Sequence, residues 1–414
     1  MNDIFRPSTE AELAEVVAWA ADCRNTLALR GSGSKQALGR PVEADHVLDL
    51  GGLSGITEYV PAELMLTARA GTPMEDIRAA LAEKGQHLAF EPPDLRPLLG
   101  GTGGEGTLGG VVSCNLGGPR RMGAGAARDH VLGVRGVGGN GAVFKAGGKV
   151  VKNVTGFDLS KLLCGAYGTL AALSEITIKV LPRPEKVRTV LVFGLDDAAA
   201  VRCMGQAARS RHEVSACAHL PEGLARASGV DLVAGAGRAV TAIRVEGPEP
   251  SVAWRCQALR NELAGFGDTE ELHSMRSARL WEEVARAVPL AAPAESLVWR
   301  LSVPPASAAD VVARIRHSLP AEAFYDWAGG LVWLAVAPGR DDAGEEVVRG
   351  AVAHVAGGHA TLFRAPAEVR ARVAPFQPQP GPLAALSQRL KDSLDPGGVF
   401  NPGRMVPIGA AKGR

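Results

Sequence analysis

The stretch GGTGGEGTLGGVVSCNLGGPRRMGAGAARDHVLGVRGVGGNGAVFKAGG, residues 100–148, decides the fold of this 414-residue chain. It holds 18 of the 51 glycines of the protein in 49 positions. Apolar residues such as Val111, Val112 and Leu116 are interleaved with these glycines and favour burial, so the stretch is not an ordinary linker. We interpret it as backbone that packs closely against another group, with the rest of the chain arranged to hold that group.

Glycine chemistry indicates what that group is. Glycine reaches positive φ without steric cost, and it lets main-chain N–H groups come within hydrogen-bonding distance of a ligand. Several N–H groups that point into one concavity bind anionic oxygens, so a phosphate or pyrophosphate is the expected guest. The alternative is a series of tight turns between short strands, without any ligand. A cluster of this length favours the phosphate-bearing ligand.

Composition excludes several classes of protein. A chain of this length holds two or three domains, and 46% apolar with 21% charged residues is typical of a globular protein. The 45 basic and 44 acidic side chains leave a net charge of +1, which does not suit a nucleic-acid-binding surface. No run approaches the ~18 consecutive apolar residues of a membrane span, and the first residues do not form a secretory signal. The six cysteines include no CxxC pair, so we expect no metal site and a reduced, cytoplasmic protein.

The amino-terminal half is predicted to mix helices and strands. Thr9 to Glu12 form a capping box, so a helix opens the chain. Residues 26–29 are a short buried strand that leads into Arg30-Gly31-Ser32-Gly33-Ser34-Lys35, a second glycine-rich turn with groups that suit phosphate oxygens. Proline at position 73 is expected at the first position of the next helix. Further strands are predicted at residues 46–50, 56–59, 64–70, 149–151 and 169–181, with a short helix beginning within residues 154–159.

The second half of the chain is predicted to be a separate domain. Pro182 and Pro184 follow the last strand of the first half, and glycine becomes less frequent after them, so we place the boundary at residue 184. From residue 297 the order is strand, helix, strand, strand, helix, strand, which is a βαββαβ unit with an antiparallel sheet. A proline-rich link at residues 375–382 precedes a last helix. The predicted domains are therefore residues 1–184, 185–382 and 383–414.

The order of these loops resembles that of a known family. The turn at Arg30 to Lys35, then Pro93-Asp94, then the loop from Thr107 to Gly118, then Arg128 to Gly133 follow the order of FAD-binding domains of the vanillyl-alcohol-oxidase and p-cresol-methylhydroxylase type. The resemblance continues through residues 154–159, Gly168-Thr169-Leu170 and Asn401-Pro402-Gly403. The whole chain resembles the FAD-binding E subunits of bacterial glycolate oxidase. A Rossmann site is excluded, because its glycines lie directly between a strand and a crossover helix.

The resemblance implies an α+β fold: a two-lobed FAD-binding domain of the p-cresol-methylhydroxylase type, then an α+β cap domain with an antiparallel sheet of ferredoxin-like units. The helix and tail from residue 383 would return to the FAD domain, with the isoalloxazine ring near Asn401. Relatives that bind FAD covalently have histidine where this chain has Ser34, so we expect non-covalent FAD. The implied cofactor-binding residues are Arg30, Gly31, Ser32, Gly33, Ser34, Lys35, Pro93, Asp94, Gly101, Gly103, Gly104, Thr107, Leu108, Gly109, Gly110, Ser113, Cys114, Asn115, Gly117, Gly118 and Asn401.

The second domain has lost reactive groups that catalytic relatives carry. Those relatives hold a divalent metal with a His-x-Gly-Asp-Gly-Asn-x-His turn and have a downstream Glu-His-Gly. Here Asp326 and Trp333 occupy the two histidine positions, and Gly358-His359-Ala360 keeps only the histidine. His359 is therefore the candidate catalytic base; the alternative is a loop histidine bonded to a backbone carbonyl. Four basic residues of this domain could still contact an anion, although arginines on amphipathic elements usually form a solvated face: Arg300, Arg314, Arg316 and Arg364.

These observations predict a flavoprotein oxidoreductase subunit. The leading hypothesis is the FAD-binding, but not the main catalytic, subunit of a glycolate oxidase or dehydrogenase that converts glycolate, a 2-hydroxy acid, to glyoxylate. Its expected partners are a homologous catalytic flavoprotein and an iron–sulfur subunit, in the cytoplasm or at the cytoplasmic face of the inner membrane. One alternative is an autonomous metal-free flavin oxidoreductase on another alcohol or hydroxy acid. The other is a structural paralogue without a redox role.

Overall fold

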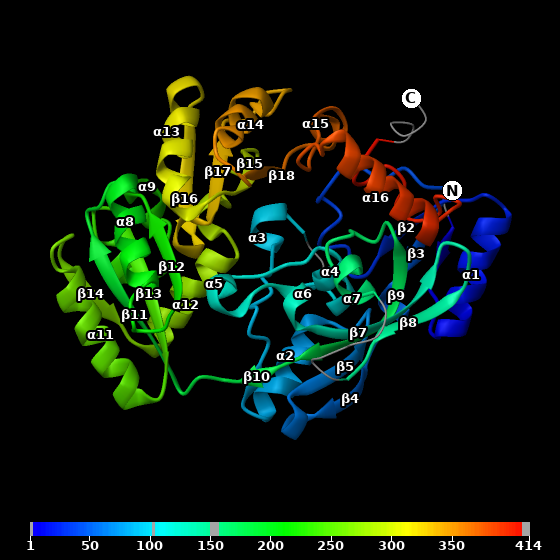
Figure 1. The fold of residues 1–414 in the computed structure, drawn as a ribbon, viewed down its shortest axis with the longest axis horizontal. Helices are drawn as coiled ribbons and strands as arrows, with labels where there is room; N and C mark the ends of the chain where they lie inside the picture. The colour runs from blue at the N-terminus through cyan, green and yellow to red at the C-terminus, as the bar shows by residue number, and fades with distance from the viewer. Residues whose placement is uncertain (1–2, 102–103, 150–156, 408–414) are drawn as a thin grey trace.

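Three sheets organise the computed structural model, which describes residues 3–101, 104–149 and 157–407 (Figure 1). A small parallel sheet and a five-stranded antiparallel sheet come from the first half of the chain. An eight-stranded antiparallel sheet, which we call the cap sheet, comes from the second half. No helix among the described residues is long and apolar enough to cross a membrane. The mixture of helices and antiparallel sheets confirms the predicted α+β fold class.

The small parallel sheet has the order β1-β3-β2 and is covered by helix α1. The helix begins after Thr9, whose hydroxyl accepts a hydrogen bond from Glu12 N at 3.2 Å, and it buries Leu13, Val17 and Ala20 at helical spacing. The elements are β1 (Ile4–Phe5), α1 (Glu10–Asp22), β2 (Leu27–Arg30), β3 (His46–Asp49) and η1 (Leu50–Gly52).

The five-stranded sheet has the order β4-β5-β9-β7-β8. Short helices pack against it, and the glycine-rich stretch supplies both helix α4 and the hairpin β7–β8. The elements are β4 (Ile56–Val60), η2 (Pro61–Glu63), β5 (Met65–Arg69), α2 (Met74–Glu83), α3 (Arg96–Leu99), α4 (Leu108–Ser113), α5 (Arg121–Ala124), α6 (Ala127–His130), β7 (Val131–Gly138), β8 (Val143–Gly147), α7 (Leu159–Leu163) and β9 (Ala171–Lys179). A separate two-stranded ladder joins β6 (Gln86–His87) to β10 (Leu181–Pro182).

The cap sheet consists of two βαββαβ units joined edge to edge. Its order is β14-β11-β13-β12-β16-β17-β15-β18, so each half repeats the same arrangement of its own four strands. The first unit holds β11 (Lys186–Phe193), α8 (Asp197–Ala208), β12 (Val214–Leu220), α9 (Glu222–Ala225), α10 (Asp231–Ala234), β13 (Val240–Gly247), α11 (Glu249–Leu263) and β14 (Thr269–Leu272). After α12 (Ser274–Ala285) and η3 (Val288–Leu290), the second holds β15 (Leu297–Ser302), η4 (Pro305–Ser307), α13 (Ala308–Ser318), β16 (Ala321–Asp326), η5 (Trp327–Gly329), β17 (Leu331–Val336), α14 (Glu345–Ala353) and β18 (His359–Arg364).

The two faces of the cap sheet bury different side chains, because successive residues of a strand point to opposite faces. On β15, Trp299 and Leu301 enter the core beneath helices α8, α11, α13 and α14. Val298 and, on β17, Trp333 belong to the core shared with the first half of the chain. Arg300 is two residues from Val298 and therefore lies on this inner face, opposite Trp333. The inner face is what the cap sheet presents to the glycine-rich half.

The C-terminal segment leaves the cap and returns to the small parallel sheet (Figure 1). After α15 (Ala367–Arg372), helix α16 (Gly381–Leu394) crosses the surface beside the N-terminal strands. Leu27 N then donates to Val399 O at 2.7 Å, and Asn401 N donates to Leu27 O at 2.9 Å. Phe400 is fully buried in the core under α1. This return agrees with the arrangement that the family resemblance implies, while the domain boundaries remain predictions.

Some elements differ from the sequence-based expectation. Strands β12 and β14 and helix α12 were not predicted, because β12 is rich in small residues and β14 is a short, charged edge strand. Pro73 occupies the N-cap of α2 rather than its first position. Residues 150–156, which include most of the strand predicted at 149–151 and the start of the next predicted helix, lie outside the described residues.

Candidate functional site

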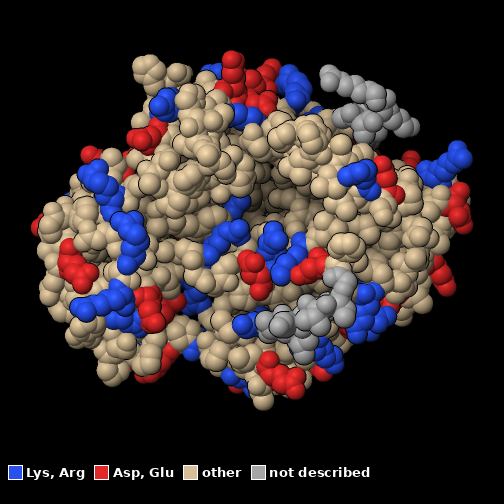
Figure 2. Space-filling model, in the orientation of Figure 1, with Lys and Arg blue, Asp and Glu red and all other residues tan. Residues whose placement is uncertain are grey.

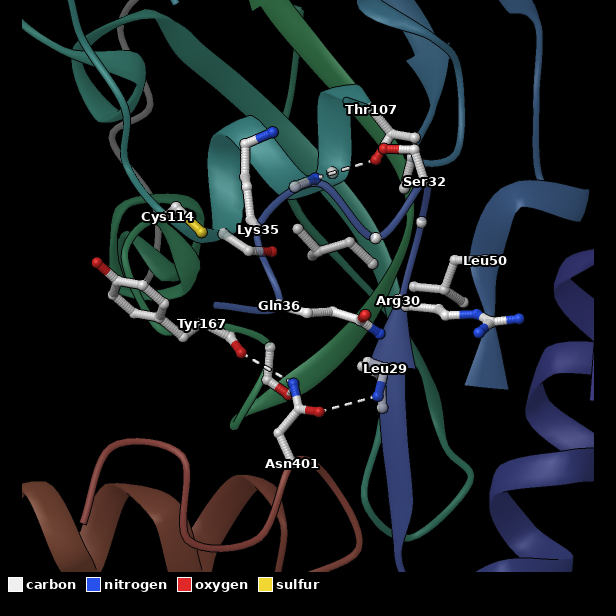
Figure 3. Close-up of a pocket in the computed structure, with 18 of the residues that line it drawn as sticks. Leu29, Arg30, Ser32, Lys35, Gln36, Leu50, Thr107, Cys114, Tyr167 and Asn401 are labelled. Atoms are coloured by element: carbon white, nitrogen blue, oxygen red, sulfur yellow. Dashed lines mark hydrogen bonds between the residues drawn. The ribbon is translucent and has the colours of Figure 1, made fainter. Parts of the chain in front are cut away.

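A cavity lies where the small sheet, the five-stranded sheet and the returning C-terminus meet (Figure 3). It encloses about 660 Å³ of free space, part of which is open to solvent. The residues that line it are Leu29, Arg30, Gly31, Ser32, Gly33, Ser34, Lys35, Gln36, Leu50, Ala70, Thr107, Gly109, Gly110, Ser113, Cys114, Tyr167, Gly168, Ala171, Leu173, Asn401 and Arg404. The two glycine-rich loops predicted from the sequence therefore face one cavity.

The first wall is the turn that follows strand β2. Gly33 has a φ of 82°, which glycine reaches without strain. A Cβ on Gly31 would lie 2.5 Å from the Thr107 hydroxyl oxygen, so the turn packs directly on the second loop. Arg30 ends the strand, but its guanidinium points away from the cavity and pairs with Asp49 at 3.3 Å. The turn thus contributes mainly backbone groups and small hydroxyls to the cavity.

The second wall is the start of helix α4. Thr107 caps this helix, because its hydroxyl accepts a hydrogen bond from Gly110 N at 3.3 Å. A Cβ on Gly109 would lie 2.9 Å from the carbonyl oxygen of Ala70, closer than real Cβ contacts come. The helix can therefore approach strand β5 only with glycine at this position. The backbone of helix α4 and the backbone at Ala70 thus meet without a side chain between them. This close packing leaves room for a ligand on the side of α4 that faces the cavity.

Lys35 is a buried cation in this cavity. Its side chain is 7% exposed, and its Nζ donates to Ser34 Oγ at 3.1 Å. No ion pair joins it to any residue in the described ranges. Burial lowers the pKa of Lys35, opposed by the more distant Cys114 and Asp94. An anion in the cavity would compensate the buried charge, so the donor set fits a phosphate-bearing ligand.

Asn401 closes the opposite end of the cavity through contacts within the protein. Its Oδ1 accepts from Leu29 N at 2.8 Å, and its Nδ2 donates to Tyr167 O at 2.9 Å and to Gly168 O at 3.2 Å (Figure 3). Arg404 lies over the Tyr167 ring and donates to Lys35 O at 2.8 Å. The side-chain amide of Asn401 therefore positions the cavity wall, and its own polar groups already have protein partners.

Several predicted cofactor-binding residues do not line this cavity. Asp94 is buried in ion pairs of 2.9 Å with Arg96 and Arg286, and Asn115 accepts a hydrogen bond from Arg128 N. Gly103 lies outside the described residues. The others that are described but do not line the cavity are Pro93, Gly101, Gly104, Leu108, Gly117 and Gly118.

Sequence reasoning also missed residues that do line the cavity. Tyr167 and Arg404 directly flank the motifs at Gly168 and Gly403, so the motifs pointed to the right places. The other residues missed are Leu29, Gln36, Leu50, Ala70, Gly168, Ala171 and Leu173. Most of these are apolar or small, and nothing in their local sequence separates them from ordinary core residues.

The inner face of the cap sheet lies across a hollow that is visible between the two halves of the molecule, with basic side chains inside it (Figure 2). Arg300 Cζ lies 5.0 Å from the centre of the Trp327 ring and 6.0 Å from that of Trp333. Arg121 Cζ, from the glycine-rich stretch, lies 4.9 Å from the same Trp327 ring. The Trp327 indole N–H donates to Gly118 O at 3.0 Å and so fixes the ring against the first half of the chain.

Asp326 and Trp333, which occupy the positions of the metal-binding histidines of catalytic relatives, lie in surroundings that do not suit a metal. Asp326 is 2% exposed and accepts a hydrogen bond from Trp327 N at 2.7 Å. Burial raises its pKa to about 7. Trp333 packs edge-on against Phe363 with ring centres 5.0 Å apart, and an indole has no lone pair with which to ligate a metal.

His359 is the first residue of strand β18, beside Ser302 on β15. His359 is exposed, and no other described residue makes a hydrogen bond with its ring. Desolvation and then the charges of Arg300 and Arg121 lower its pKa. Both effects favour the neutral form of the imidazole, which is the form that a base requires.

Comparisons with known proteins agree with this geometry. Residues 3–147 match the family model described as FAD binding domain. The chain is 37% identical to glycolate oxidase subunit GlcE of Escherichia coli K12 over 396 residues, which cover 95% of this chain and 96% of that protein. It is 31% identical to glycolate oxidase subunit GlcD of Bacillus subtilis over 191 residues, or 46% of this chain and 39% of that protein.

Solved structures show the same fold at low identity. p-Cresol methylhydroxylase aligns with a TM-score of 0.74 over 98% of this chain and 89% of that chain, at 13% identity. 4-Ethylphenol oxidase from Gulosibacter chungangensis aligns with a TM-score of 0.73 over the same shares, at 14% identity.

Proposed function

We propose a function from one premise: the chain belongs to the family of the glycolate oxidase subunit GlcE. It is an FAD-binding oxidoreductase, and its relatives include a D-lactate dehydrogenase of Archaeoglobus fulgidus. Our proposal is that it serves as an FAD-binding subunit of a complex that oxidises glycolate to glyoxylate. The observation that carries this proposal is the cavity between the two glycine-rich loops, with the uncompensated Lys35 inside it.

The cavity residues would hold the FAD without a covalent bond. When bound, the FAD supplies the acceptor for the hydride that a 2-hydroxy acid loses. Backbone groups of the turn after β2 and of the start of α4, together with Lys35, would contact the anionic part of the cofactor. Ser34 has no nucleophilic ring nitrogen, and its hydroxyl is engaged by Lys35. This residue supports our proposal that the FAD is held non-covalently.

We place the main catalytic step in another subunit. Trp333 and the buried Asp326 occupy the positions where catalytic relatives are expected to bind a metal, and the Trp333 ring is packed between Arg300 and Phe363. The names of the relatives GlcE and GlcD imply a multi-subunit complex. We propose that the partners are a homologous catalytic flavoprotein and an iron–sulfur subunit. The complex would be cytoplasmic, free or held at the cytoplasmic face of the inner membrane by those partners.

The first test is the state of the flavin. The purified full-length chain should show the visible absorbance of oxidised flavin, and acid denaturation should leave that flavin in the supernatant. Flavin that stays with the precipitated protein would refute non-covalent binding. A colourless chain that does not bind added FAD would refute the cofactor assignment itself.

The second test separates the complex from its rivals. Anaerobic glycolate should leave the flavin of the isolated chain oxidised, because the metal-binding pair is missing, and should reduce it only after the partner subunits are added. Full bleaching of the isolated chain would identify an autonomous oxidoreductase. A reconstituted complex with full activity and an FAD-free variant of this chain would instead identify a structural paralogue.

A further inference from the structure

Two consecutive arginines of the glycine-rich stretch have very different surroundings. Arg120 is compensated: its Nε donates to Glu246 at 2.9 Å, and Glu91 lies 3.6 Å away. Arg121 has no side-chain hydrogen bond and no ion pair with any other described residue. The ordinary explanation of an unpaired arginine is a solvated surface position, but Arg121 is half-buried with its guanidinium against the Trp327 ring.

Arg300 repeats this situation from the cap sheet. It is half-buried at the centre of the inner face and stacks on Trp327 and Trp333, yet it also lacks an ion pair within the described part of the chain. Some other cap arginines do have partners for their buried donors. Arg364, for example, donates to the carbonyl oxygens of Leu98 and Ser296 among others. The sequence favoured a solvated face for Arg300. The structure instead places Arg300 half-buried against two tryptophan rings.

The two uncompensated cations are close to each other. Their Cζ atoms lie 4.9 and 5.0 Å from one ring centre, so they can be no more than about 9.9 Å apart. Each is desolvated, and Arg121 further lowers the pKa of Arg300, which falls to about 10. Two like charges in a partly desolvated site repel, and an anion between them removes that repulsion.

No described acidic side chain supplies this anion. Asp326 raises the pKa of Arg300 but lies beyond ion-pair distance from it. Burial favours the neutral form of Asp326. Asp129 likewise raises the pKa of Arg121 without forming an ion pair with it. The other titratable groups that interact electrostatically with the pair are Arg128, which lowers the pKa of Arg121, His359, whose pKa burial lowers, and Tyr167, whose pKa burial raises. The site thus holds two cations, neutral hydrogen-bonding groups and aromatic walls.

We propose that Arg121 and Arg300 bind the carboxylate of a small organic acid at the inner face of the cap sheet. Guanidinium groups bind carboxylates through paired, charge-assisted hydrogen bonds. Trp327 positions both arginines: it is anchored to Gly118 and lies in a turn where Trp327 and Ala328 have φ values of 53° and 57°, which non-glycine residues rarely adopt. Arg121 and Arg300 are both only half-buried, so the site is open to solvent. This site goes beyond the proposed function, because it does not require the chain to reduce its own flavin.

Calorimetric titration of the purified full-length, FAD-supplemented chain tests the proposal. The probes are the sodium salts of glycolate, glyoxylate, acetate and oxalate, with sulfate and chloride as non-carboxylate anions. We expect saturable binding of at least one carboxylate at a single site. Arg300→Gln and Arg121→Gln should each weaken it about 10- to 100-fold, as loss of charge-assisted hydrogen bonds does. Arg340→Gln, an exposed arginine paired with Asp342, should change it less than about twofold.

Thermal unfolding without ligand separates binding from a structural role. Removing one of two repelling cations should leave the Tm of Arg300→Gln and Arg121→Gln unchanged or raised, and added carboxylate should raise the Tm of the natural chain only. Unaltered binding in the double variant, equal binding of sulfate or chloride, or no binding by any carboxylate would overturn the proposal. FAD content, measured on the same samples, reports on the proposed function independently.

Discussion

The two sites that we propose, on two sides of the molecule, would bind their ligands by different means. On the first side, the turn after β2 and the start of α4 present backbone groups, which approach closely because Gly31 and Gly109 have no Cβ. On the second side, the inner face of the cap sheet presents the guanidinium groups of Arg300 and, by contact with Trp327, Arg121. One side consists of short continuous segments, and the other consists of residues that lie far apart in the sequence.

This difference has an energetic consequence. The backbone side is rigid and depends on glycines that no other residue can replace, so a single added carbon atom should abolish its function. The side-chain side holds charges that are not compensated in the described structure, so its variants should change ligand binding and pH dependence more than folding. Four predictions test this contrast, in decreasing order of the expected effect.

Gly109→Val should abolish FAD binding. The new Cβ would lie 2.9 Å from Ala70 O, so helix α4 would have to move away from strand β5 and open the cavity. We expect a loss of at least about 3 kcal/mol, or more than roughly a hundredfold in affinity. Fluorescence titration with FAD measures this. Gly350→Val, in helix α14, is the control, because its Cβ would meet nothing within 4 Å; equal losses in both variants would contradict the prediction.

Asp326→Asn should remove a pH dependence of stability. Burial raises the pKa of Asp326 from 3.8 to about 7, so between these values the folded chain holds a proton that the unfolded chain has released. Stability therefore falls as pH rises from about 4 to about 7, by up to about 4 kcal/mol, although Arg244 and Arg300 oppose the shift.

Denaturant unfolding from pH 5 to 8 measures this effect. Asn keeps the Oδ1 acceptor for Trp327 N and stays neutral, so the variant should exceed the natural chain in stability at the upper end of the range. Asp341→Asn, at a side chain that is 81% exposed, should leave the natural pH profile in place. Parallel profiles for the natural chain and Asp326→Asn would rule out the raised pKa.

Asn401→Ala should lower stability and weaken FAD binding together. The variant leaves the buried Leu29 N–H without its acceptor, which costs about 1–3 kcal/mol. Alanine is also less favourable than asparagine at the φ of 42° found here. Urea unfolding and FAD titration measure both effects. Asn140→Ala, in an exposed turn, is the control; an FAD effect without a stability effect would show that Asn401 contacts the cofactor directly.

His359→Gln should have the smallest effect. The residue is exposed and its ring has no hydrogen bond within the described residues, so the free energy of unfolding should change by less than about 0.5 kcal/mol. FAD affinity should stay within about twofold, since His359 does not line the cofactor cavity. If glycolate reduces the flavin of the isolated chain, loss of that flavin reduction in His359→Gln would instead support a role of His359 as a base.

The sequence predicted the backbone side better than the side-chain side. Gly31, Gly33, Gly109 and Gly110 could be recognised because a glycine-rich turn carries its function within a few adjacent residues. Arg121 and Arg300 could not, because their environment depends on a sheet register and on Trp327, more than 200 residues from Arg121. Asp94 looked like a cofactor ligand from its place between the loops, but Arg286 of the distant helix α12 engages its carboxylate.

The pairing of Leu27 with Phe400 has a consequence for biosynthesis. A ribosome releases the chain from its amino end, so the glycine-rich loops emerge long before the segment that closes their cavity. Until Val399, Phe400 and Asn401 have left the exit tunnel, β2 pairs only with β3, and the Tyr167 carbonyl lacks the hydrogen bond from Asn401. The wall of the cavity at Asn401 is therefore completed only after residue 401 has been synthesised, later than both glycine-rich loops.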